Sequence, residues 1–224
     1  EGPKFYKHDG WYWIMCPAGG VATGWQLAMR SKSPYGPYEC KTVMAQGKSS
    51  VNGPHQGGWV HTAQGEDWFL HFQDKGAYGR VVHLQPLTWK NNWPVIGIDK
   101  NGGLCGEPVM KYRKPKSSSS VICNPAESDE FNTPQLGLQW QWQADYRQAF
   151  GMPTANGVIR LFTNKLKDGQ SLWAAPNLLL QKTPADKFTA TTKMRFASKA
   201  ENQYGGIVMM GMDYSALVVK RVGE

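Results

Sequence analysis

Two stretches of similar make decide the fold, Glu1-Gly2-Pro3 and Asn52-Gly53-Pro54-His55-Gln56-Gly57-Gly58. In each stretch the Gly-Pro pair makes a rigid corner, because proline fixes its own φ and restricts the residue before it. The first corner carries a carboxylate and the second carries an imidazole. A polar side chain on such a corner is held at a fixed angle above a sheet. This position suits a catalytic group, and it also suits an ordinary turn.

The segments that follow the two corners repeat each other. Gly10 closes a turn before the aromatic run 11–15, and Gly65 closes a turn before the run 67–72. Both segments are typical of β-hairpins whose second strand is rich in aromatic residues. The two corners are roughly fifty residues apart, which is the period of a four-stranded propeller blade. The repeat therefore predicts blades of a β-propeller.

Helical periodicity is nearly absent, and the chain contains 25 glycines and 14 prolines between short β-prone runs. The serine-rich run 115–120 is typical of a solvated linker. We therefore predict an all-β protein with a first domain over residues 1–114, a linker over 115–127 and a second domain over 128–224. In the second domain we expect strands at 158–162, 178–182, 188–196, 206–212 and 216–220.

A third segment carries the resemblance to a known family. It contains Gly79-Arg80 before a strand and Trp93-Pro94-Val95 as a closing element. Together with the Glu-Gly-Pro and His-Gln-Gly turns, these motifs occur in the order that is found in glycoside hydrolase family 43. Residues 1–112 resemble this family, and the glycine-rich run 18–26 resembles its arabinofuranosidase and xylosidase branch. The resemblance implies a partial five-bladed β-propeller that lacks its N-terminal part.

The second domain resembles the concanavalin-like β-sandwich that follows the propeller in many members of this family. The similarity rests on residues 128–132, 136–142 and 204–214. It implies a partial sandwich, because the family's domain continues beyond such a point. Asp129 and Glu130 begin this unit, and they suit either a structural calcium ion or a simple turn at the start of a strand.

Charge and composition limit the possible partners. The formal net charge is +8 and there are 10 tryptophans, yet the basic residues are scattered and no aromatic RNA-binding motif is present. We therefore expect no nucleic-acid partner. Indole faces suit sugars and sheet cores equally well. No apolar run is long enough to predict a membrane span, and the four cysteines lack the spacing of a zinc site.

The resemblance implies an inverting glycoside hydrolase that releases terminal arabinofuranose or xylose from plant cell-wall polysaccharides or oligosaccharides. It also implies a periplasmic or extracellular location. Inversion needs two carboxyl groups about 6.5–9.5 Å apart. By resemblance Glu1 is the general acid, and the base lies on a blade outside this chain, so we expect the fragment alone to be inactive. A frayed terminal residue is the alternative for Glu1, and a non-catalytic carbohydrate-binding β-propeller is the alternative for the protein.

Four more residues are candidates for the site. By resemblance His55 points into the propeller channel and helps to hold a hydrated calcium ion, and Gln56 lines the same channel. A histidine that caps its turn is the alternative. Arg80 offers a planar set of donors to sugar hydroxyls or to a carboxylate, or else forms a surface salt bridge. Trp25 is expected to lie in a glycine-rich loop and suits either a sugar platform or a plug between blades.

Overall fold

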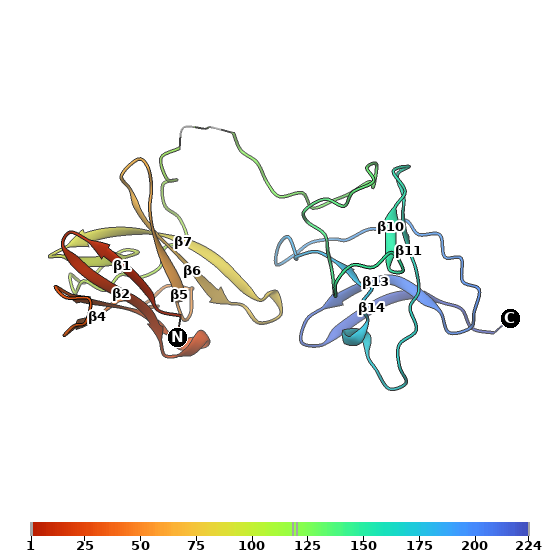
Figure 1. Cartoon of the computed structure of the whole chain (residues 1–224), viewed down its shortest axis with the longest axis horizontal. Helices are drawn as coiled ribbons and strands as arrows, with labels where there is room; N and C mark the ends of the chain where they lie inside the picture. Colours follow the sequence, from red (N-terminus) through yellow and green to blue (C-terminus); the bar gives the residue numbers. More distant parts are fainter. Residues whose placement is uncertain (1, 118, 120, 224) are drawn as a thin grey trace. The chain divides into compact units, whose positions relative to one another are not determined.

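The computed structural model describes residues 2–117, 119 and 121–223, and it divides the chain into two compact units, Glu1–Ser120 and Val121–Glu224 (Figure 1). Strands make up most of the regular structure, as the sequence predicts. The α-helix α1 (Gly20–Thr23) and two 3₁₀ turns, η1 (Gly76–Tyr78) and η2 (Leu172–Ala174), are short. In the part of the chain that is described, no helix is long and apolar enough to cross a membrane.

The first unit contains two four-stranded antiparallel sheets, each built in chain order. The first sheet consists of β1 (Lys4–His8), β2 (Trp11–Ala18), β3 (Trp25–Ser31) and β4 (Glu39–Met44). The second consists of β5 (His55–His61), β6 (Asp67–Asp74), β7 (Arg80–Lys90) and β8 (Trp93–Ile96). The two expected blades are therefore confirmed, with the expected repeat from β1 to β5.

Tight turns set the register of these sheets. Asp9 and Gly10 join β1 to β2 with φ values of 48° and 72°, and His8 pairs with Trp11. A two-residue turn with positive φ at both positions matches the twist of a hairpin, and Asp-Gly is a favoured sequence for it. Residues 91 and 92, both asparagines, turn β7 into β8 in the same way, with φ values of 50° and 55°.

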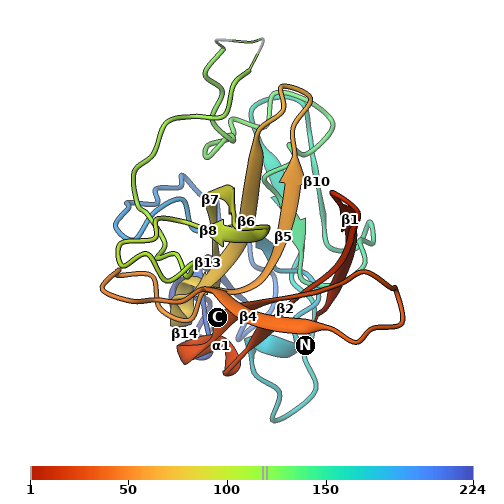
Figure 2. The same cartoon turned by 90° about the vertical axis from the view of Figure 1, so that its left-hand side faces the viewer.

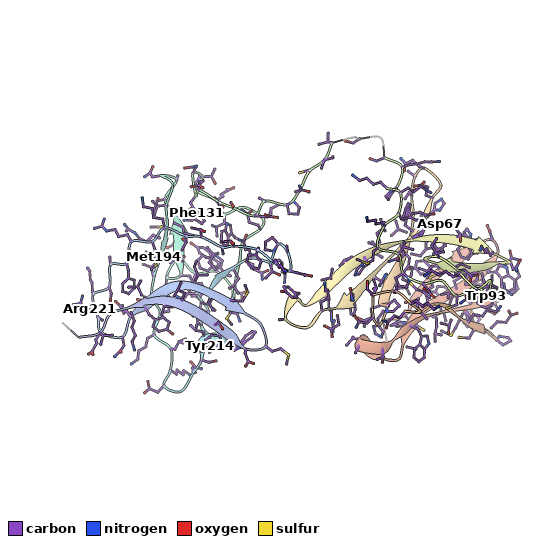
Figure 3. All side chains as sticks on the ribbon, turned by 180° about the vertical axis from the view of Figure 1, so that it is seen from behind. Asp67, Trp93, Phe131, Met194, Tyr214 and Arg221 are labelled. Atoms are coloured by element: carbon purple, nitrogen blue, oxygen red, sulfur yellow. The ribbon has the colours of Figure 1, made fainter. Side chains whose placement is uncertain are left out.

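The core of the first unit lies where the two sheets meet. β5 contacts β2 and β3, and β8 contacts β4, as can be followed in Figure 2. The buried side chains from both sheets form one cluster, namely Trp13, Met15, Ala28, Val43, Met44, Phe69, Leu87, Trp93 and Ile96. Figure 3 shows the dense packing of side chains around Trp93. Asp67 accepts hydrogen bonds from the indole nitrogens of Trp59 (2.8 Å) and Trp89 (2.9 Å), so these half-buried N–H groups are paired.

Beyond β8 the chain is held against the second sheet through Lys116. Glu66 accepts a hydrogen bond from the backbone N–H of Lys116 (2.8 Å), and it forms an ion pair with Arg113. The Arg113 guanidinium lies 5.4 Å from the ring centre of Trp68, which also donates to Glu66. These contacts lower the pKa of Glu66: the Lys116 hydrogen bond has the largest effect, burial opposes it, and Arg113 and Trp68 add to it. The Glu66 carboxylate therefore holds the segment around residues 113–116, which follows the second sheet.

The second unit contains three two-stranded sheets: β9 (Gln141–Trp142) with β12 (Leu179–Leu180), β10 (Gly151–Pro153) with β11 (Ile159–Leu161), and β13 (Tyr204–Met210) with β14 (Tyr214–Lys220). The expected strand at 188–196 is wrong, because this segment is irregular. Met194 and Phe196 lie beside Gly205 of β13, so the segment runs along a strand without joining its ladder. Most apolar side chains of this unit are exposed, and Phe150 and Ala175 are among its few buried ones.

Candidate active site

A β-bulge places the two polar residues of the second corner. On β5, His55 pairs with Phe72 and Gly58 pairs with Leu70, so β5 has one residue more than β6 between these pairs. Gln56 occupies the bulge with a φ of 49°, which is in the left-handed region. A bulge bends its strand and redirects the side chains beside it. His55 and Gln56 therefore depart from the in-and-out alternation of β5.

The first of the two glycines after Gln56 is needed for this bulge. A Cβ on Gly57 would overlap the ring of Phe69, which is fully buried in the core. A Cβ on Gly58 would lie 3.6 Å from the side chain of Lys4, which is an ordinary contact. Gly57 thus lets β5 pass close to β6 where the site begins.

His55 is 1% exposed and lies between the two sheets. A Cβ on Gly24, just before β3, would come within 2.7 Å of its Cδ2 atom, so glycine allows the imidazole to approach the first sheet. On the other side, the imidazole packs edge-on against Phe72 at 5.9 Å between ring centres. The imidazole is therefore fixed by packing from both sheets.

Arg80 reaches the same aromatic ring. It begins β7 opposite Asp74, and its guanidinium lies 4.8 Å from the ring centre of Phe72. The side chain is exposed, and among the described ion pairs none involves Arg80. Phe72 thus connects His55 with an accessible guanidinium that has donors available for a ligand.

The first corner approaches the second one at Gln56. Gly2 has a φ of 50°, and a Cβ at this position would lie 3.6 Å from Nε2 of Gln56. The Nζ atom of Lys4 lies 3.5 Å from the Gly2 carbonyl oxygen. Glu1 itself lies outside the described residues. The structure therefore brings the residue after Glu1 to the amide of Gln56, although the two corners are far apart in the sequence.

Trp25 lies on a strand and not in a loop, which corrects the prediction for its position. Gly19 and Gly20 have φ values of 81° and 79°, so the chain reverses into α1 and Trp25 pairs with Ala18 as the first residue of β3. Its ring packs directly over Gly19, where a Cβ would overlap it. The side chain is 38% exposed, so part of the indole remains accessible near the start of the strand.

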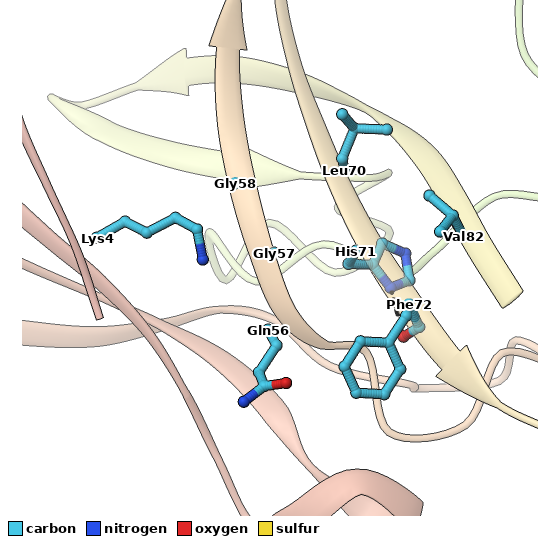
Figure 4. Close-up of a pocket in the computed structure, with 8 residues that line it drawn as sticks. All are labelled: Lys4, Gln56, Gly57, Gly58, Leu70, His71, Phe72 and Val82. Atoms are coloured by element: carbon cyan, nitrogen blue, oxygen red, sulfur yellow. Dashed lines mark hydrogen bonds between the residues drawn. The ribbon is translucent and has the colours of Figure 1, made fainter. Parts of the chain in front are cut away.

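A shallow cleft of about 220 Å³ lies beside Gln56 and Phe72 (Figure 4). Lys4 reaches it from β1, as Figure 4 shows, and Leu70, Val82 and the backbone of residues 57 and 58 form its apolar part. An ammonium, an amide and an apolar floor together suit a small ligand with many hydroxyl groups.

Calcium at His55 stays a prediction. Calcium takes six to eight oxygen ligands, and the described residues contain no cluster of three or more His, Cys, Asp or Glu side chains that could hold a metal ion. In the second unit, Asp129 accepts hydrogen bonds from the Phe131 backbone N–H (2.7 Å) and from the Trp140 indole (2.9 Å). These bonds are those of a structural turn, the simpler of the two roles expected for Asp129.

A polar ladder on β6 and β7 was not predicted from the sequence. His71 and Gln73 on β6 lie near His83 and Gln85 on β7, and the two imidazoles stack at 5.4 Å. The signal was available, because His-Phe-Gln at 71–73 and His-Leu-Gln at 83–85 place polar residues with period two inside apolar strands. The contacts that these four polar side chains make with one another could not be read from the sequence.

Hydrogen bonds fix the tautomer of His71. Its Nδ1 lies 3.1 Å from the Phe72 carbonyl oxygen, which can only accept, so Nδ1 carries the proton. His71 Nε2 then accepts a hydrogen bond from the side-chain amide nitrogen of Gln85 at 3.2 Å. The amide oxygen of Gln85 accepts a hydrogen bond from the Val109 backbone N–H at 2.8 Å. Burial lowers the pKa of His71 to about 4, the Phe72 carbonyl opposes this shift, and His83 adds to it. Burial, followed by the positive charge of Lys75, also lowers the pKa of His83.

Comparison with known proteins identifies relatives for both units. Residues 1–94 match the family model described as "Glycosyl hydrolases family 43", and residues 128–224 match "Beta xylosidase C-terminal Concanavalin A-like domain". A protein named "Putative beta-xylosidase" from Xylanibacter ruminicola is 40% identical over 94% of this chain and 39% of its own length. One named "Non-reducing end alpha-L-arabinofuranosidase BoGH43B" from Bacteroides ovatus is 29% identical over 100% of this chain and 44% of its own.

A solved structure shows the same fold. The crystal structure of the GH43 BlXynB protein from Bacillus licheniformis matches 98% of this chain and 46% of its own, with a TM-score of 0.76 and 22% identity. The chain thus spans less than half the length of each of these relatives.

Proposed function

The chain belongs to glycosyl hydrolase family 43, and from this premise we propose that it forms part of an enzyme that releases terminal xylose or arabinofuranose from plant cell-wall polysaccharides or their fragments. The two four-stranded sheets are propeller blades of this family, and the second unit is its concanavalin-like domain. Because such polymers lie outside cells, we place the protein in the periplasm or outside the cell.

The observation that carries this proposal is the meeting of the two Gly-Pro corners. Gln56 lies beside Gly2, and Phe72 contacts both His55 and Arg80. The corner that carries Glu1, the bulge and the start of β7 therefore converge on one end of the blades. The amide of Gln56 can both donate to and accept from hydroxyl groups, and the Arg80 guanidinium can donate several hydrogen bonds in one plane. Such a set suits a pentose.

In the proposed reaction Glu1 protonates the leaving oxygen, which is the general-acid half of an inverting hydrolysis. Arg80 and Gln56 bind and orient the terminal sugar, and Trp25 offers an indole face to a sugar ring. His55 is a packed wall of the site. The described residues offer a calcium ion one imidazole here, so no step of the mechanism depends on a metal. No residue of this chain is assigned the role of the base.

The test is an assay of the protein as its gene encodes it, with xylo-oligosaccharides and arabino-oligosaccharides as substrates. Proton NMR of the first product follows both the release of sugar and the configuration at its anomeric carbon. We expect release of a pentose with inverted configuration. Binding of these sugars without release would favour the non-catalytic alternative. Release with retained configuration would contradict the inverting mechanism proposed here, in which the second carboxylate activates water and does not attack the sugar.

A further inference from the structure

A chain of hydrogen-bonded side chains runs behind the second corner and ends at α1. His83 Nε2 on β7 lies 3.0 Å from Gln73 Oε1 on β6. Gln73 Nε2 donates to Asn52 Oδ1 at 2.8 Å and to the Ser50 carbonyl at 3.0 Å. Asn52 Nδ2 donates to the carbonyl of Ala22 in α1 at 3.0 Å. Three side chains thus connect β7, β6 and the corner before His55 with α1.

The direction of this chain follows from its two backbone acceptors. The carbonyls of Ser50 and Ala22 can only accept, so the amide nitrogens of Gln73 and Asn52 must face them. The amide oxygens then face the other way, and Gln73 Oε1 must receive its hydrogen bond from His83 Nε2. Every donor therefore points from β7 towards α1, and no amide in the series can flip without setting two like groups against each other.

α1 depends on this chain because it buries no side chain of its own: none of its four residues is buried. Asn52 donates a hydrogen bond to Ala22, and Gly53 approaches so closely that a Cβ there would overlap the carbonyl oxygen of Val21. α1 also lies beside β6. A helix of one turn is not stable by itself in water. The place of α1 is therefore set from the corner at 52–53.

The proposed site has Trp25 on one side and His55 with Gln56 on the other, and both sides begin next to the hydrogen-bonded side chains of Asn52 and Gln73. α1 leads directly into Gly24, which faces His55, and into Trp25. The corner at 52–53 leads directly into His55 and Gln56. A shift of Asn52 therefore moves the tryptophan wall and the histidine–glutamine wall relative to each other.

We propose that Asn52 and Gln73 are positioning residues of the active site, which hold α1 with Trp25 and the corner with His55 and Gln56 in the arrangement that binds the terminal pentose. This inference rests on the proposed function. Neither residue is assigned a contact with the sugar; both act through the groups that they hold.

The test uses Asn52→Asp, which keeps the oxygen facing Gln73 and puts an oxygen in place of the nitrogen facing Ala22. Gln73→Glu makes the corresponding change at the preceding hydrogen bond, because it puts an oxygen in place of the nitrogen that faces Asn52. Gln64→Glu, on the exposed loop between β5 and β6, is the matched control. We expect KM for a xylo- or arabino-oligosaccharide to rise on the order of fivefold in the first two variants, the effect of losing about one hydrogen bond. We expect kcat to change much less, and the control to behave like wild type.

A second measurement decides the inference without activity. Hydrogen exchange read by mass spectrometry should show faster exchange across residues 19–26 in Asn52→Asp, whereas β2 residues 11–16 should exchange as in wild type. Unchanged exchange at residues 19–26 in Asn52→Asp would overturn the positioning role. Equal losses in kcat and kcat/KM in the two variants, together with a lower melting temperature, would also overturn it, because they would indicate a general loss of stability. If wild type releases no pentose, the proposed function fails, and the exchange data still decide whether Asn52 holds α1.

Discussion

Acidification should weaken the first unit because His71 must be neutral in the fold. Its Nε2 accepts a hydrogen bond from Gln85, so a protonated imidazole would set two donors against each other at 3.2 Å. The pKa is lowered from 6.5 to about 4. The unfolded chain therefore binds this proton more tightly. The stability contributed by a neutral His71 is full above pH 6.5 and is lost progressively as the pH falls from 6.5 to about 4.

The size of this effect follows from the shift. One pKa unit corresponds to about 1.4 kcal/mol, so a shift from 6.5 to about 4 corresponds to about 3 kcal/mol in total. About 2 kcal/mol of this should appear between pH 7 and pH 5. The free energy of unfolding can be measured with urea at several pH values, with tryptophan fluorescence as the signal, because the first unit contains a cluster of buried and half-buried indoles.

The comparison is between wild type and His71→Leu. The variant should be less stable at pH 7, because Gln85 loses its partner, yet its stability should fall by about 2 kcal/mol less than that of wild type between pH 7 and pH 5. Carboxylates titrate in both proteins, so their contribution cancels in the difference. Parallel curves for the two proteins, or a His71 pKa near 6.5 measured by NMR in the folded protein, would refute this reasoning.

Three further changes test other parts of the structure. Arg80→Lys should lower turnover about tenfold or more, because lysine lacks the planar set of donors, while the melting temperature stays close to that of wild type; wild-type kinetics would remove Arg80 from the site. Gly57→Ala should destabilise the first unit by about 1–3 kcal/mol, since the methyl group overlaps the Phe69 ring, and urea unfolding with no change would contradict the bulge. Glu66→Gln should lower the hydrogen-exchange protection of the Lys116 amide at neutral pH, and wild type should lose the same protection as the pH falls below 4.5, because the pKa of this carboxyl is lowered in the fold; equal protection in both proteins at neutral pH would contradict this role of Glu66.

Local signals were enough to predict the blades. Asp9-Gly10 is a hairpin turn in its own right, and aromatic strands follow it and Gly65 at a regular spacing. These features act over a few residues, so they can be read without knowledge of the fold. The prediction of a strand at 188–196 was wrong because a strand does not depend on local signals alone. Residues that favour β-structure form a strand only where a neighbouring backbone pairs with them.

The candidate residues of the site could be predicted from the sequence, but the contacts that hold them in place could not all be predicted. The corner motifs identified Gln56, His55 and Arg80 as candidates, and the structure brings them to one end of the blades. Trp25 is on a strand because two left-handed glycines reverse the chain before it, and this glycine pair could have been read as a turn. Asn52 holds a helix thirty residues earlier in the sequence. This second contact joins distant segments and leaves no local signal.

The central claim is that this end of the blades performs general-acid catalysis through Glu1, and the leaving-group dependence of Glu1→Gln tests it most directly. In the protein as its gene encodes it, Glu1→Gln should lower turnover of a xylo- or arabino-oligosaccharide on the order of 10²–10⁴-fold, the usual contribution of a general acid. An aryl pentoside with an activated leaving group should lose much less, because its leaving oxygen needs little protonation. Equal losses on both substrates, or wild-type turnover of the oligosaccharide, would contradict the account.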